Sequence, residues 1–560
     1  MTINKKVIIL GGGVGGLSAA HELIERNTSS HKFDIEIYEK DPNIPGGKAR
    51  SLPVPNSGIG GRRNLPAEHG FRFFPGFYQH ITDTMKRIPF RNDSVFHNLV
   101  DTSRLLIGRA NHEPFVAISR FPQNLTDWEQ AFEDYFKISE TGLTKDDIHF
   151  FASKLWQILT SCDDRRLAEY EKICWWDFIE ASSRSIEYQD FLANGLARSL
   201  TANNPHIGNT RTLGNIYLQL ILGVFDPGSS TDRLLNGPTN EVWIDPWLSY
   251  LEGLGVKYKL GAEVGKVKLS NGAISSVQIL YSNNIEEWVE GDYFIFSVPV
   301  EVMGTILENN PEITSLDPKL SGIITLKNDV AWMNGLMFYL NEDVPIVNGH
   351  QLYVNSPWSI TAVSQAQFWK DFQFQNCGNG NVKGILSTDI SNWEAPGIIY
   401  NKPACDLEDE KIKEEVWAQL KLSLNVNGKE ILKDSMIETW YLDPDIKYIK
   451  QGIVENKIHI NTQPLLVNLV NKWTYRPSSF SIIPNLFLAS DYVRTNTDLA
   501  CMEAANEAAR RAVNDILEIS NNNSSYCKIW ELEEPLLFKP FKIKDQERFN
   551  KGLPWNGKLF

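Results

Sequence analysis

Residues 5–16 of the chain read KKVIILGGGVGG, and this stretch decides the fold. The apolar run before the glycines is typical of a parallel strand that is buried on both faces. The glycines then predict a tight turn into a helix: Gly11 permits the turn, Gly13 lets the backbone approach a pyrophosphate, and Gly16 allows the helix to pack against the strand. The N-terminal amides of that helix would face the pyrophosphate charge. The stretch therefore predicts a dinucleotide-binding unit.

The second half of this unit ends in an acid. Residues 33–39 read FDIEIYE, an alternation that predicts a second strand ending at Glu39. A carboxylate in this position accepts hydrogen bonds from ribose hydroxyls and disfavours a 2′-phosphate. A glycine-rich loop alone would be weak evidence. Here strand, loop, helix, second strand and acid occur in the required order.

Three further motifs distinguish a flavin from a nicotinamide. Residues 46–50 read GGKAR, residues 68–78 read EHGFRFFPGFY, and residues 485–492 read NLFLASDY and are followed by MEAA at 502–505. With these motifs the chain resembles the superfamily of FAD-dependent amine oxidases and phytoene desaturases, which carry a GG-xx-R element, a flavin-lining segment and a C-terminal flavin motif in the same order. The segment 68–78 is especially similar to carotenoid desaturases. The resemblance implies FAD as the cofactor.

The resemblance also implies cofactor contacts spread over the chain. Asp491 is implied to bind the ribityl and pyrophosphate region, Met502 the pyrimidine end of the flavin, and Val264 the adenine through its backbone. Ser490 and Ala504 depart from the glycines that are usual in the family, so the backbone approach there is expected to differ. The implied cofactor-binding residues are Gly11, Gly13, Gly15, Gly16, Glu39, Lys40, Gly47, Lys48, Ala49, Arg50, Gly70, Phe71, Val264, Asp491 and Met502.

The sequence assigns no catalytic residue firmly. His69 and Arg72, both in the flavin-lining segment, are the candidates. Each has a plain alternative: a packed histidine bound to a carbonyl group, and an arginine in a surface ion pair. The chain shows no Ser/His/Asp spacing, no HExxH and no paired metal ligands, so no metal is expected.

Composition narrows the functional classes. The chain has 560 residues and a formal net charge of −14, which makes nucleic acid an unexpected partner and disfavours anionic lipid. The six cysteines are scattered without a Cys-x-x-Cys pair, which suits a reducing compartment. No apolar run reaches the roughly 18 residues that would cross a bilayer. We expect a cytoplasmic protein whose membrane contact, if any, is peripheral; the oligomeric state stays open.

The cofactor motifs are discontinuous in the chain. We therefore predict an α/β fold in which a Rossmann-like FAD-binding domain is built from separated segments, beside a mixed α+β substrate domain. The FAD-binding segments are placed at 1–105, 232–300 and 483–520. The substrate domain takes a helical segment at 106–231 and a strand-rich segment at 301–482, with a strand at 335–340 and a helix from around 409 to 424. The aromatic tail at 521–560 is expected to pack on the body.

The sequence indicates the substrate less directly than the cofactor. A flavin accepts hydride, so the protein must mainly hold a C–H bond over the ring and exclude water. The aromatic residues favour a small-molecule substrate that is lipophilic or aromatic, although each could be core or part of a cage for an amine. We predict an oxidoreductase that removes hydride to make a double bond in an isoprenoid-like or carotenoid-like molecule. The alternatives are an amine or amino-acid oxidase producing peroxide, a redox-neutral flavin isomerase or dehydroxylase, and a flavin-binding scaffold without activity.

Overall fold

The computed structural model describes residues 3–70, 73–119, 121, 141–226, 232–451 and 456–559. Its first layer is a five-stranded parallel sheet with the strand order β11-β2-β1-β15-β25. The strands come from distant parts of the chain: β1 (Ile3–Leu10), β2 (His31–Tyr38), β11 (Lys257–Lys259), β15 (Tyr293–Phe296) and β25 (Leu486–Leu488). The predicted α/β fold class with a discontinuous Rossmann-like sheet is confirmed.

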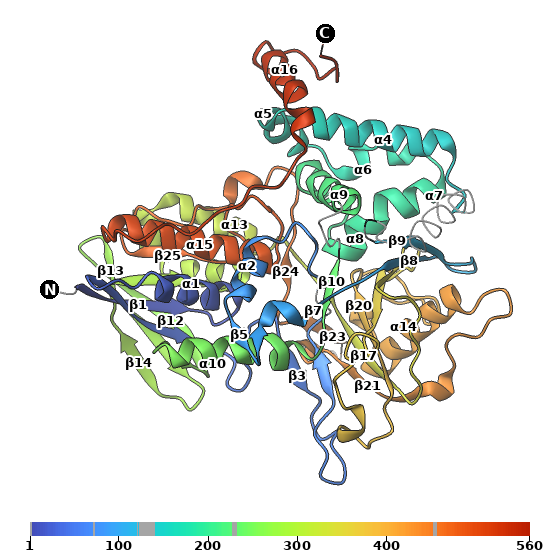
Figure 1. Ribbon diagram of the computed structural model, residues 1–560, viewed down its shortest axis with the longest axis horizontal. Helices are drawn as coiled ribbons and strands as arrows, with labels where there is room; N and C mark the ends of the chain where they lie inside the picture. Colours follow the sequence, from blue (N-terminus) through green and yellow to red (C-terminus); the bar gives the residue numbers. More distant parts are fainter. Residues whose placement is uncertain are drawn as a thin grey trace.

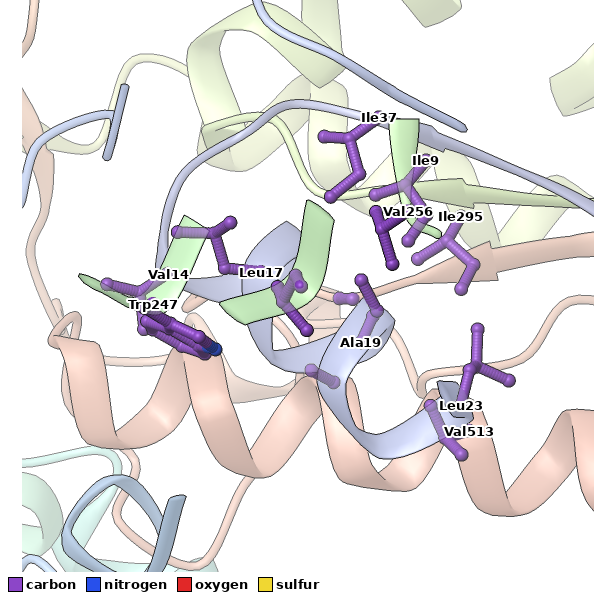
Figure 2. Packing of buried hydrophobic residues seen from close by; sticks show 14 of the residues in the cluster. Ile9, Val14, Leu17, Ala19, Leu23, Ile37, Trp247, Val256, Ile295 and Val513 are labelled. Atoms are coloured by element: carbon purple, nitrogen blue, oxygen red, sulfur yellow. The ribbon is translucent and has the colours of Figure 1, made fainter. Parts of the chain in front are cut away.

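Helix α1 (Val14–Glu25) lies between this sheet and α15 (Met502–Ile519). Figure 2 shows Leu23 of α1 beside Val513 of α15, with the strand residue Ile9 on the sheet side of the helix. All three side chains are fully buried. Burying one such side chain contributes about 1.5–3 kcal/mol. This packing holds the N-terminus of α1 at the carboxyl edge of the sheet.

A second sheet has seven strands in the order β21-β17-β20-β19-β18-β8-β9. It lies to the right of the first sheet in Figure 1. Its strands are β8 (Arg104–Gly108), β9 (Phe115–Ile118), β17 (Asn334–Leu340), β18 (His350–Tyr353), β19 (Ile360–Ser364), β20 (Gly384–Ile390) and β21 (Ile437–Leu442). Helix α14 (Asp409–Leu424) packs on this sheet through Val416 and Leu420. The strand and the helix predicted within this region are present. The β8–β9 hairpin, however, occupies the start of the segment that the sequence predicts to be mainly helical, because β8 pairs in parallel with β18.

A small antiparallel sheet stands beside β2. It consists of β12 (Ala262–Ser270), β13 (Ala273–Tyr281) and β14 (Glu286–Val289). The backbone amide of Ala262 donates to the carbonyl oxygen of Glu39 at 2.8 Å, so β12 starts next to the end of β2. This contact brings a segment from the middle of the chain to the predicted nucleotide edge.

A further part of the fold is mainly helical. It contains α4 (Lys145–Thr160), α5 (Asp163–Arg165), α6 (Trp175–Phe178), α8 (Leu196–Thr201) and α9 (Thr210–Phe225). In its aromatic core Trp175 stacks on Tyr217, with 4.8 Å between the ring centroids. The C-terminal helix α16 (Lys539–Asn550) rests on this region (Figure 1), where the buried carboxylate of Asp545 accepts a hydrogen bond from Arg165 Nε at 2.9 Å. None of the helices in the described ranges is both long and apolar enough to cross a membrane.

Candidate functional site

The glycine loop between β1 and α1 lies against the ends of the neighbouring strands. Gly11 has a φ of +106°, which residues with a side chain rarely adopt. A Cβ atom on Gly15 would lie 2.1 Å from the carbonyl oxygen of Ala489, and one on Gly16 would lie 2.0 Å from that of Gly11. A Cβ atom on Gly13, by contrast, would meet no atom of the described residues closer than 3.6 Å. Gly15 and Gly16 are therefore required by the packing of the protein itself, whereas Gly13 leaves room at the loop.

The N-terminus of α1 adds hydrogen-bond donors at the same place. Gly13 is the N-cap residue in an extended conformation, and no side chain caps the helix. The first amides of an α-helix have no partner within the helix. An uncapped helix N-terminus at the carboxyl edge of a parallel sheet is the usual binding site of a pyrophosphate.

Glu39 lies buried at the end of β2, against the glycine loop. Its Oε2 accepts a hydrogen bond from the amide of Gly12 at 2.8 Å, and its Oε1 accepts one from the amide of Asp41 at 2.9 Å. The hydroxyl of Tyr258 donates to the carbonyl oxygen of Gly12 at 2.8 Å, so β11 also contacts the glycine loop at this corner, where the end of β2 meets the loop. Burial raises the pKa of Glu39. A carboxylate held in this way beside the loop is suited to ribose hydroxyls.

Lys40 and Val264 fall in the same corner. Lys40 forms an exposed ion pair with Glu263 of β12, with 2.7 Å between Nζ and Oε1. Val264 follows Glu263 along β12 and packs against the core beneath the sheet. The fold thus brings together the residues that the resemblance implies on the adenine and ribose side.

The GGKAR segment turns back onto the glycine loop. Gly46 forms a parallel β-bridge with Gly13, and a Cβ atom on Gly47 would lie 3.0 Å from the Cα atom of Gly13. Lys48 extends from this turn toward Glu301 in the first turn of α11 (Val300–Asn309), with 3.4 Å between Nζ and Oε1. The segment therefore places a cation next to the loop, at the ends of the parallel strands.

The C-terminal motif reaches the same edge from β25. Burial, together with the nearby charge of Asp491, raises the pKa of Glu301. Oε2 of Glu301 and the hydroxyl of Tyr492 are buried without a hydrogen-bond partner among the described residues. A polar ligand would satisfy such groups. Met502 begins α15 and packs against the core that contains Ala49.

Glu503, in the same motif, has a structural role that the sequence does not reveal. Its carboxylate accepts hydrogen bonds from the amides of Gln79, His80 and Ile81 at 2.8–2.9 Å and thereby caps α2 (His80–Lys86). His80 Nδ1 lies 2.7 Å from Oε1 of Glu503, while its Nε2 accepts from the amide of Trp530 at 2.9 Å. Because Nε2 is an acceptor, the ring is neutral and Nδ1 carries the proton. This histidine connects the C-terminal tail at Trp530 to the first turn of α15.

His69 lies in a buried cluster of charges that includes two acids following β21. Its Nδ1 is 2.7 Å from Oδ2 of Asp443 and 3.3 Å from Oδ2 of Asp445. Arg50 donates to Oδ2 of Asp445 at 2.7 Å, and Asn334 donates to Oδ2 of Asp443 at 2.8 Å. Burial would lower the pKa of His69, but the two carboxylates outweigh burial and raise it. Despite burial, His69 and Arg50 lower the pKa of Asp445 to about 2.

The same cluster has the composition of a metal site. His69, Asp443 and Asp445 are the one group in the described ranges whose ligand atoms could hold a metal ion, all lying within 4.8 Å of one another. The carboxylate oxygens that face His69 also accept from Asn334 and Arg50, which favours a protonated histidine over a ligand set. The two acids lie far from His69 in the sequence. Their one signal is the DPD triplet directly after a strand-like run.

The flavin-lining segment is described only in part. Phe71 and Arg72, two of the residues named from the sequence, lie outside the described residues. Gly70 has a φ of +71°, and a Cβ atom there would lie 3.3 Å from Oδ1 of Asp389 in β20. The backbone of this segment therefore passes close to the seven-stranded sheet.

Next to this segment is a small cavity. Glu68 lines it, with Leu234, Leu235, Phe368 and Trp369 supplying an apolar wall. Thr239 holds the carboxylate of Glu68 through its amide at 3.0 Å and its hydroxyl at 2.5 Å. The cavity is therefore apolar on one side, and its acid is already bound by the protein.

Comparisons with known proteins agree with this geometry. A family model described as flavin containing amine oxidoreductase matches residues 14–517. The carotenoid φ-ring synthase of Chlorobaculum tepidum is 35% identical over 79 residues, which are 14% of this chain and 11% of that protein. The match thus spans about a tenth of that relative's length.

Solved structures are similar over nearly the whole chain. Putrescine oxidase with bound putrescine aligns with a TM-score of 0.59 and 13% identity, covering 92% of this chain and 100% of that one. Cyclohexylamine oxidase from Brevibacterium oxydans IH-35A aligns with a TM-score of 0.58 and 9% identity, covering 92% and 99%. An oxidoreductase from Methanosarcina mazei gives 0.57 and 13%, covering 92% and 100%. At these identities the likeness shows the fold alone.

Proposed function

The chain belongs to the flavin containing amine oxidoreductase family and is an FAD-dependent oxidoreductase; we propose that it removes hydride from a C–H bond of a lipophilic, isoprenoid-like substrate and leaves a double bond. Bound FAD would supply the hydride acceptor. The rest of the proposal concerns what the residues of this chain do.

The residues at the edge of the parallel sheet fit the parts of FAD. The amides at the start of α1, with Gly13 open beside them, would hold the pyrophosphate. Glu39 would accept from the ribose of the adenosine half. Asp491 and the unpartnered Oε2 of Glu301 would serve the ribityl side, and Lys48 would balance their charge.

The substrate class is inferred from the sequence and from the partial match to carotenoid φ-ring synthase. The cavity beside Glu68 has an apolar wall of Leu234, Leu235, Phe368 and Trp369, but its volume of about 10 Å³ has room for one water molecule only, so an apolar chain would have to displace the wall to enter. The acid in this cavity is occupied by Thr239.

The proposal is tested with purified holoenzyme under anaerobic conditions. A panel of carotenoid precursors and a panel of amines are each added while the absorbance of the oxidised flavin is followed. We expect bleaching by the isoprenoids, with turnover restored by a quinone. Bleaching by amines alone, with peroxide formed in air, would establish an amine oxidase instead. A product at the oxidation level of its substrate would establish redox-neutral chemistry.

A pair of variants tests whether the substrate enters the cavity beside Glu68. Phe368→Ala removes part of the cavity wall and should raise KM for the isoprenoid. Phe374→Ala is the control, because Phe374 packs on the same hydrophobic cluster without lining the cavity. An equal change in KM for both variants would show that the substrate does not lie there.

A further inference from the structure

One buried arginine, Arg476, forms hydrogen bonds with the backbone of the turn that follows β25. Nε of Arg476 donates to the carbonyl oxygen of Tyr492 at 3.0 Å, and Nη2 donates to that of Val493 at 3.2 Å and to that of Asp491. The remaining nitrogen, Nη1, donates to Oδ1 of Asp498 at 2.6 Å. Arg476 is only 3% exposed. Its planar guanidinium thus spans three consecutive carbonyl groups of the turn that carries Asp491.

Asp498 connects this arginine to the helical region. Its Oδ2 accepts from the hydroxyl of Thr212 at 2.6 Å and from Arg211, both in the first turn of α9. Asn468 donates to the backbone carbonyl oxygen of Asp498 at 2.9 Å. Asp498 is 2% exposed and has a φ of +50°, a left-handed conformation that costs free energy in a residue with a side chain. The surrounding bonds hold it in that conformation.

The electrostatics of the group make the connection stiff. The carboxylate of Asp498 lies between two guanidinium groups, those of Arg476 and Arg211. Glu171 pairs with Arg211 at 3.3 Å and so balances the second arginine. Moving one of these residues away would leave a buried charge uncompensated, which is strongly destabilising. The ion pairs therefore restrain the positions of all four side chains. Arg211 is further fixed by stacking on Trp473, at 3.9 Å from the ring centroid.

We propose that Arg476 and Asp498 are positioning residues that shape the Asp491 turn for FAD and couple it to α9. This inference rests on the proposed FAD site. Binding of FAD at the turn restrains the carbonyl groups held by Arg476, and Asp498 transmits the restraint to Thr212 and Arg211. Because coupling between two sites is reciprocal, ordering of α9 strengthens FAD binding by the same factor. The helical region is thereby assembled around the cofactor.

Hydrogen exchange of the full-length protein tests the coupling without an activity measurement. Apoprotein and protein saturated with FAD are compared by mass spectrometry. In the wild type, FAD should slow exchange in residues 489–501 and also in residues 210–216 of α9. Asp498→Asn keeps the size of the side chain but lets it accept toward only one of its two sides. In this variant FAD at saturation should still protect 489–501, and the protection of 210–216 should disappear.

A second variant and a control keep the test decisive if Asp498→Asn folds poorly. Arg476→Lys keeps the charge but cannot span three carbonyl groups, so its Kd for FAD should rise about tenfold, the change that corresponds to 1.4 kcal/mol. Arg494→Lys is the control, because Arg494 is exposed and donates from Nη2 to the carbonyl oxygen of Thr474. It should bind FAD like the wild type.

The possible failures are distinguishable. If FAD does not protect 489–501 in the wild type, the proposed FAD site is wrong. If FAD protects 489–501 but leaves 210–216 unchanged, or if the protection of α9 persists in Asp498→Asn, the coupling is refuted while the site stands. An unchanged FAD affinity in Arg476→Lys would remove the positioning role of Arg476.

Discussion

Two glycines of the same loop should fail for opposite reasons when they are replaced by alanine. The Cβ atom of Gly15→Ala would lie 2.1 Å from the carbonyl oxygen of Ala489 and 2.5 Å from the hydroxyl oxygen of Ser297. Backbone atoms cannot move aside as a flexible side chain can. Overpacking of this kind costs about 1–3 kcal/mol. Gly15→Ala should therefore lower the stability of the apoprotein by that amount.

Gly13→Ala should leave the stability of the apoprotein nearly unchanged. Its Cβ atom would meet described neighbours at 3.6 Å or more, and its φ of −75° suits any residue. The loss of backbone freedom in the unfolded chain would stabilise such a variant by about 0.4–1 kcal/mol, and the poorer preference for alanine than for glycine at an N-cap position offsets that gain. The new methyl group would instead occupy the space proposed for the pyrophosphate. Losing one hydrogen bond to a charged group costs about 1.5–3 kcal/mol, so Kd for FAD should rise by about one to two orders of magnitude.

The two effects are measured separately on apoprotein. Urea unfolding followed by circular dichroism gives the stability, and quenching of flavin fluorescence gives Kd for FAD. Wild-type affinity in Gly13→Ala would refute the pyrophosphate assignment. Wild-type stability in Gly15→Ala would refute the packing of the loop against β25.

Three further outcomes are expected. Asp491→Asn should weaken FAD binding about tenfold with little loss of apoprotein stability, measured by the same titration, and undiminished affinity would remove Asp491 from the site. The folded-state pKa of His69 is raised above its usual value of about 6.5, so its contribution to stability is complete below that pH and is lost as pH rises through the folded pKa. The unfolding free energy of the wild type should therefore fall as the pH rises above about 6.5, and a pH slope as steep in His69→Asn would contradict this. Asp545→Ala leaves the buried Arg165 with Glu169 as its remaining carboxylate partner, so the loss of stability should stay below the cost of an uncompensated buried charge, which is about 3–5 kcal/mol. Limited proteolysis should cut the tail of this variant first, and an equally resistant tail would show that the pair does not hold α16.

The glycine loop and the strands beside it could be predicted because each of these positions admits few residue types. Local geometry determines three of these positions, and the sequence shows them as a pattern. Gly11 has a positive φ, Gly16 has no room for a Cβ atom, and an acid follows the second strand. The distant strands of the same sheet were reachable through the C-terminal motif, whose apolar run ends next to an acid. These features depend on neighbours within a few residues, and a single sequence displays them.

Composition does not indicate which aromatic residues form the core and which line a substrate site. The aromatic content favours a lipophilic or aromatic substrate, yet Trp175 and Trp358 are fully buried and Trp369 is 2% exposed, so these three rings belong to the core. Of these three, Trp369 also lines the cavity beside Glu68. A buried ring and a ring that lines a site have the same sequence pattern, because both need only an apolar surrounding. Three-dimensional placement alone separates them.

The buried ion pairs were hidden for a different reason. Asp443 beside His69 and Asp498 beside Arg476 need no fixed spacing, since a carboxylate can come from any segment that passes within hydrogen-bond distance. What such a pair does need is a second restraint that keeps it in place, such as Asn334 on Asp443 or Thr212 on Asp498. Both pairs join residues from different segments of the chain. The glycine loop at the edge of the parallel sheet can therefore be predicted from the sequence, whereas its attachment to the rest of the fold is made of long-range charge contacts that only the fold reveals.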